Sequence, residues 1–73
     1  DLLFAEVTSD QVRQALDDLP ERQRSALLLC YYQGLSNRDT AAVLDLTVAA
    51  LESLLARARR ALKQNLADAS IRV

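Results

Sequence analysis

Apolar residues recur at intervals of three or four along much of this 73-residue chain, the spacing that places side chains on one face of a helix. The first such stretch covers about residues 10–19, and Thr8 or Ser9 can cap its start. Its apolar face consists of Val12, Ala15, Leu16 and Leu19. Pro20 ends this helix and can serve as the first residue of the next one, where no N–H is needed. The pattern therefore predicts two consecutive helices joined at a proline.

The second predicted helix is apolar on nearly every side. It has Glu21 in its first turn and continues through the run Ala-Leu-Leu-Leu-Cys-Tyr-Tyr at residues 26–32, until Gly34 stops it in a left-handed C-cap. A helix of this kind is either the buried centre of a small bundle or keeps one face for a partner. We interpret Tyr31 and Tyr32 as core and rim residues rather than a platform for stacked bases, because adjacent helical residues share no face.

A short third helix is predicted next. Ser36 can cap its start, and Asp39 stands where a capping box places an acid. Leu46 then anchors a three-residue turn. The inward candidates of this helix are Ala41, Val43 and Leu44.

The fourth predicted helix is the longest and becomes basic towards its end. Thr47 can cap it, and we expect it to run to about Leu66, while residues 67–73 have no pattern that indicates structure. Its inward face is predicted to be Val48, Leu51, Leu54, Leu55, Ala58, Leu62 and Leu66. A short helix, a tight turn and a longer basic helix are the layout of a DNA-reading helix-turn-helix.

The charge distribution changes the meaning of a net charge of only −1. Residues 1–22 contain six acids and two bases, whereas residues 47–66 contain four bases and one acid. A basic end on an acidic body is typical of a module that meets phosphate with one face. It is equally expected of a solvated helix end whose bases complement the helix dipole.

The outward side of the fourth helix carries the candidate DNA contacts. Small residues near its start, Ala49, Ala50 and Ser53, permit close approach to the major groove. Arg57 lies one turn beyond Ser53 and is a candidate for a bidentate contact to guanine or for a phosphate contact; the sequence does not separate the two. Arg60 and Lys63 are phosphate candidates. Arg38, near the start of the third helix, is a candidate for a contact to the DNA backbone.

Other chemistry has little support in this composition. The chain has no histidine and a single cysteine, so neither a disulfide nor a zinc site is expected, and stability must come from helix packing. We interpret Cys30, among leucines, as a buried structural thiol rather than a redox sensor. Asp17 and Asp18 are adjacent on a helix and do not face each other. No apolar run approaches the roughly 20 residues that span a bilayer. Because the chain opens without Met, we expect it to be part of a longer protein.

Several motifs together resemble a known family. They are Leu-Pro-Glu-Arg-Gln-Arg at 19–24, Leu-Leu-Leu-Cys-Tyr-Tyr-Gln-Gly-Leu-Ser at 27–36, Ala-Ala-Val-Leu at 41–44 and Leu-Ala-Arg-Ala-Arg-Arg-Ala-Leu at 55–62. Over about residues 12–64 the chain resembles region four, the C-terminal promoter-reading domain, of bacterial sigma factors of the extracytoplasmic-function type.

The resemblance implies a compact four-helix domain that binds the upstream (−35) promoter element through its last helix. It also implies an apolar groove on the earlier helices for the flap of the RNA polymerase β subunit, and frequent inhibition by an anti-sigma factor that covers these surfaces. Carried over by position, the family's DNA contacts fall at Thr47, Ala50, Glu52, Ser53, Ala56, Arg57 and Arg60.

Some positions depart from the family pattern. Thr40 replaces a common Ile, and Asp45 replaces a frequent turn Gly, although Asp tolerates a left-handed backbone better than most residues. Ala-Ala-Leu-Glu at 49–52 replaces a common Gly-Thr-Val-Lys, and Leu54 replaces a common Arg. Glu52 can accept a hydrogen bond from cytosine N4, or it can pair with Arg59 or with a base of a partner. These changes predict weak DNA binding by the isolated domain.

The sequence thus predicts an all-α fold, a compact four-helix domain with a C-terminal helix-turn-helix and no wing. Residues 10–66 form the domain, 1–9 a linker remnant and 67–73 a tail. The expected function is promoter recognition by a cytoplasmic sigma factor, with promoter DNA, RNA polymerase and an anti-sigma factor as partners, and with no enzyme activity, cofactor, metal, small-molecule substrate or membrane insertion. The alternatives are a protein-interaction module and an unrelated helix-turn-helix regulator.

Overall fold

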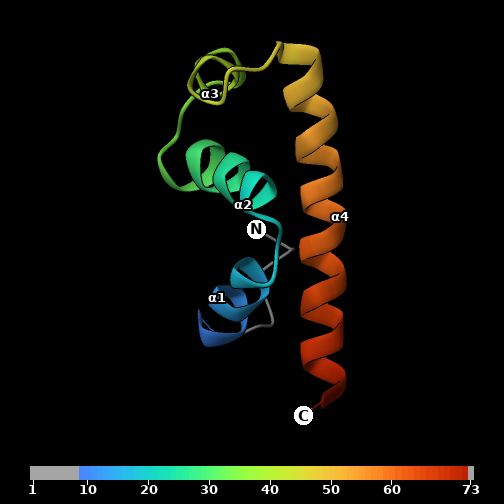
Figure 1. Ribbon diagram of the computed structural model, residues 1–73. Coiled ribbons are helices and arrows are strands. Elements are labelled where there is room, and N and C mark those ends of the chain that lie inside the picture. Colours follow the sequence, from blue (N-terminus) through green and yellow to red (C-terminus); the bar gives the residue numbers. More distant parts are fainter. Residues whose placement is uncertain (1–8, 73) are drawn as a thin grey trace.

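Three short helical segments pack along one side of a single long helix in the computed structural model (Figure 1). The structure describes the backbone of residues 9–72 and the side chains of residues 9–68. The elements are α1 (Ser9–Asp17), α2 (Glu21–Leu27), the π-helix η2 (Leu28–Tyr32), α3 (Asn37–Val43) and α4 (Val48–Arg72). Since η2 continues α2 directly, these form four helices, and there is no strand within residues 9–72. The predicted all-α class is confirmed.

An arginine of α2 closes the junction between α1 and α2. The Arg24 guanidinium donates to the carbonyl oxygens of Asp17 and Leu19 at 3.2 and 3.4 Å. A cation beside the unpaired carbonyls at the end of α1 stabilises that end. Pro20 occupies the N-cap of α2, one position earlier than predicted, and its carbonyl accepts the Arg24 N–H at 3.0 Å. Of the two predicted caps of α1, Thr8 lies outside the described residues and Ser9 is already helical.

The core is built mainly of leucine and alanine from all four helices. Its buried residues are Ala15, Leu16, Leu19, Ala26, Leu27, Ala41, Leu51, Leu54, Leu55, Ala58, Leu62 and Leu66. Six of the seven positions predicted to face inward on α4 are in this set. Val48, the seventh, is 42% exposed. It is the first residue of α4, and the described residues cover its side chain only in part.

The inward face of α3 differs from the prediction. Ala41 is buried as expected and Leu44 is half-buried, but Val43 is 61% exposed and Thr40 is fully buried in its place. The Thr40 hydroxyl lies 3.3 Å from Sγ of Cys30, so the polar atom has a partner inside the core. Cys30 itself is half-buried rather than buried.

The second helix is buried only in its first part. Ala26 and Leu27 belong to the core, whereas Tyr31 and Tyr32 are 57% and 65% exposed, so neither tyrosine is the core residue that we predicted. The helix ends in a wider turn, in which the Gln33 N–H donates to the Leu28 carbonyl five residues earlier at 3.0 Å. The first part of the apolar run is therefore buried, and a partner for the exposed second part stays a prediction.

Two residues with a left-handed backbone lie on either side of α3, one after η2 and one after α3 itself. Gly34 has φ +74°, as predicted for a C-cap. Asp45, in the turn after α3, has φ +58°. The Leu46 N–H donates to the Ala41 carbonyl at 2.8 Å and so closes that turn. The structure thus confirms a left-handed backbone at the position where Asp replaces glycine.

We expect Asp45→Gly to stabilise the domain by about 0.5–1 kcal/mol, because glycine adopts a left-handed backbone without the clash of a Cβ. Urea unfolding followed by circular dichroism measures this change. The matched control is Gly34→Ala, whose Cβ meets no atom within 4 Å but keeps the strained φ, and which should lose about 1 kcal/mol. A loss of stability in Asp45→Gly would mean that the aspartate makes a favourable interaction that offsets its backbone.

The fourth helix is longer than predicted, since it continues from Leu66 to Arg72. Neither glycine nor proline occurs after Thr47 to stop it. Asn65 Nδ2 donates to the Ala15 carbonyl at 3.0 Å, and Leu66 packs in the core, so α1 holds this part of α4. Gln64 Nε2 also donates to Asp68 Oδ1 at 3.0 Å, one turn along the helix. The expectation of an unstructured tail after Leu66 is therefore wrong.

Candidate nucleic-acid interface

The segment from α3 to α4 is a helix-turn-helix whose two helices both start at a side-chain cap. Ser36 Oγ accepts the Asp39 N–H at 3.0 Å, and Thr47 Oγ1 accepts the Ala50 N–H at 3.0 Å. Each bond satisfies an N–H that has no partner in the first turn of the helix. Both predicted caps are confirmed, and they set the directions in which α3 and α4 begin.

An arginine of α2 holds the turn between these helices. Arg22 Nη2 donates to the Leu44 carbonyl at 3.1 Å, at the end of α3. Together with the Arg24 bonds, this contact explains the two arginines that follow Pro20: each caps the C-terminal end of another helix. Sequence reasoning missed this role. The Arg22 contact joins residues 22 positions apart, and no local pattern reports such a contact.

The first three helices lie on one side of α4 and leave its other side open (Figure 1). Most of the predicted contact residues are at the surface. Ala56 is half-buried, and the other nine are exposed: Arg38, Thr47, Ala49, Ala50, Glu52, Ser53, Arg57, Arg60 and Lys63. They are thus accessible, while their contact with DNA stays a prediction.

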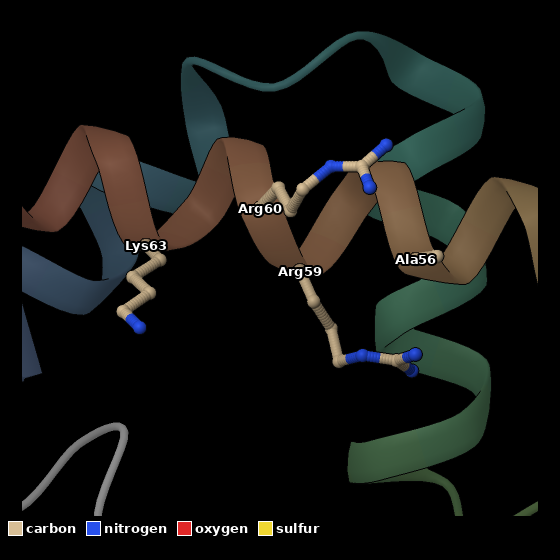
Figure 2. Close-up of a pocket in the computed structure, with 4 residues that line it drawn as sticks. All are labelled: Ala56, Arg59, Arg60 and Lys63. Carbon is tan, nitrogen blue, oxygen red and sulfur yellow. The ribbon is translucent and has the colours of Figure 1, made fainter.

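Three bases on the open side of α4 have no acidic partner. Arg57, Arg60 and Lys63 form no ion pair with any residue of the described part of the chain. Figure 2 shows the long side chains of Arg59, Arg60 and Lys63 spreading in different directions from α4. Together with Ala56 they line a hollow in the surface. Such a surface has positive charge that the domain itself does not neutralise, and it attracts phosphate.

Arg59, which lines the same hollow, has a partner within the domain. Its Nη1 donates to the Tyr31 hydroxyl at 3.2 Å, which ties the middle of α4 to the end of η2. The pairing of Arg59 with Glu52, one of the alternatives from the sequence, is not the arrangement found. Arg59 thus has a structural contact, and the open bases of α4 are Arg57, Arg60 and Lys63.

Two other possibilities for the described residues are a metal site and a membrane-spanning helix. No group of three or more histidine, cysteine or acidic side chains within them is placed to hold a metal ion. Within the same residues, no helix combines the length and apolar character that crossing a membrane needs.

The family model described as "Sigma-70, region 4" matches residues 9–62, which include α1, α2, η2, α3 and the first half of α4. The chain belongs to the sigma-70 region 4 family. Searches of curated proteins and of solved structures found no match.

Membership of the region 4 family indicates the general role of this helix-turn-helix. A sigma-70 region 4 domain is a DNA-binding part of a sigma factor that recognises promoters and works with RNA polymerase in transcription initiation, and the family is not a class of enzyme. The predicted family is thereby confirmed at the level of region 4. The extracytoplasmic-function type within it stays a prediction.

The departures of this region 4 domain from the family pattern have visible structural consequences. Thr40 keeps a fully buried place through its contact with Cys30. Asp45 takes the left-handed backbone that glycine takes elsewhere. Leu54, at a position where arginine is common, is buried, and so adds to the core rather than to the surface. The departures at Thr40, Asp45 and Leu54 therefore leave the scaffold of the domain intact. The departures that alter its surface lie at residues 49–52.

Proposed function

We propose that this region 4 domain recognises the upstream (−35) promoter element with the open side of α4. The observation that carries the proposal is the uncovered face of that helix, with small residues at its start and unpaired bases farther along. A helix of this kind enters the major groove with its N-terminal turns, while bases beyond them meet the phosphates.

Most of the predicted contact residues have a role in this proposal. Ala49, Ala50 and Ser53 lie nearest the base edges, and Arg57 contacts either guanine or phosphate. Arg60 and Lys63 of α4 and Arg38 in the first turn of α3 bind the DNA backbone. The cap residue Thr47 does so as well, because its hydroxyl accepts the Ala50 N–H and keeps its own hydrogen for a phosphate.

We also propose that the apolar end of the second helix docks on protein partners. Leu28, Leu29 and Leu35 are half-buried there, and Tyr31 and Tyr32 are exposed. Aromatic residues on an otherwise polar surface are typical of protein interfaces. The partners in this proposal are the β flap of RNA polymerase and an anti-sigma factor, both acting in the cytoplasm. An interaction module that works mainly through this surface is the second candidate function.

A salt titration of DNA binding tests the first function. We expect the affinity for promoter duplexes to fall steeply as salt rises, because binding releases counterions from the phosphates. Arg57→Ala should weaken binding by about 1–3 kcal/mol and relax the preference at one position if the arginine contacts a base. Fluorescence anisotropy with labelled duplexes at about 50 mM salt suits the weak binding expected here.

The control for Arg57→Ala is Arg13→Ala, which removes the same charge from an exposed residue of α1. Equal losses in both variants would reject the assignment of Arg57 to the interface. If no duplex binds, while a fragment with the β flap binds with little dependence on salt, the interaction module becomes the function of this domain.

A further inference from the structure

Glu52 is the one acid on the fourth helix between its cap and Lys63, and it is exposed in the second turn. It lies three residues after Ala49 and four before Ala56, so these three residues form one stripe along the helix. Alanine on both sides of the glutamate lets the backbone approach a neighbouring molecule closely. The carboxylate therefore lies in the part of α4 that is best shaped for the major groove.

The domain itself provides no partner for this carboxylate. Glu52 forms no hydrogen bond or ion pair with any side chain of the described residues. Arg59, about two turns farther along the helix, donates instead to the Tyr31 hydroxyl at 3.2 Å. Of the roles that the sequence leaves open for Glu52, the structure thus removes the internal pair and retains the external contacts.

An unpaired carboxylate is unfavourable near DNA unless a base supplies a donor. In the major groove the donors are the N4 amino group of cytosine and the N6 amino group of adenine. Adenine also presents its N7 acceptor beside N6, and two acceptors facing each other repel. Cytosine presents no acceptor in the major groove, so its amino group is the better partner for a carboxylate.

We infer that Glu52 is a specificity-determining residue that selects a cytosine in the bound promoter element by accepting a hydrogen bond from its N4 amino group. This inference rests on the proposed function, in which α4 is the promoter-reading helix. It means that this domain reads one position of its target with an acceptor.

Selection from a library of randomised duplexes, followed by sequencing, tests the inference with the whole 73-residue chain. The wild-type protein should prefer cytosine at one position by about fivefold to 100-fold. Glu52→Gln should shift that same position to adenine, because a glutamine amide pairs with N6 and N7 together. The other positions should keep their preferences. Glu21→Gln, which removes the same charge from an exposed glutamate of α2, should leave every position unchanged.

The possible outcomes separate the inference from the function on which it rests. If the wild type selects a sequence but Glu52→Gln strengthens binding equally for all duplexes, Glu52 only repels phosphate and the inference is overturned while the proposed function stands. If the wild type selects no sequence and binds no duplex, both are overturned. Unfolding curves of the variants, expected to match the wild type at this exposed site, exclude misfolding as the cause.

Discussion

Replacing Leu51 with alanine is expected to lower the free energy of unfolding by about 3–5 kcal/mol, which would leave a large share of this small domain unfolded at 25 °C. Leu51 is 0% exposed and packs in the core near the start of α4. Truncation removes buried apolar contacts and leaves a cavity that a rigid helix packing cannot close. A 73-residue chain whose single cysteine excludes an internal disulfide has little stability to lose.

The matched control is Val48→Ala, one turn earlier on the same helix. Val48 is 42% exposed, so its truncation should lose less than about 1 kcal/mol, although the helical pattern places both residues on one face. Urea unfolding followed by circular dichroism measures both variants. Equal losses would mean that parts of the protein outside residues 9–68 also cover the start of α4.

The second large effect is expected on DNA binding. The triple variant Arg57→Ala, Arg60→Ala, Lys63→Ala should reduce the affinity for promoter duplexes by about 100-fold or more at 100 mM salt. It should also lower the slope of log affinity against log salt by about 2–3, one unit for each phosphate contact that is lost. These three side chains are exposed and unpaired within the described residues, so their removal should leave folding unchanged.

A charge-preserving variant provides the control for this experiment. Arg57→Lys with Arg60→Lys keeps every positive charge but removes the planar guanidinium groups. Its salt slope should equal that of the wild type, whereas its preference among sequences should weaken if either arginine contacts a guanine. An unchanged slope in the triple variant would show that DNA, if bound, meets another face of the domain.

Local signals in the sequence predicted most of the scaffold correctly. The caps Ser36 and Thr47, the left-handed Gly34 and six inward residues of α4 all appear as expected. Each depends on residues within about four positions, where side-chain spacing and backbone preference act directly. The candidate DNA face followed from the same spacing, because residues opposite the apolar stripe of a helix lie at the surface.

The wrong predictions concern where packing ends. Val43 and Val48 have the right spacing to face the core but are 61% and 42% exposed. By contrast, α4 continues past Leu66, where Asn65 and Leu66 are held in place by α1 and the core. A helical pattern reports the direction of a side chain around the helix axis, and it carries no information on how far along the axis a neighbouring helix extends.

The amino-acid sequence by itself determined four helices, the caps of the last two, most of the apolar face of α4 and the region 4 family, since these depend on neighbouring residues and on their order. Only the tertiary structure decided which polar groups remain free. It pairs Arg22 and Arg24 with the carbonyls of other helices and Arg59 with Tyr31, and it leaves Glu52 and Arg57 unpaired within the described residues. Contacts between distant segments arise only when the helices pack, and they determine which side chains are left for DNA.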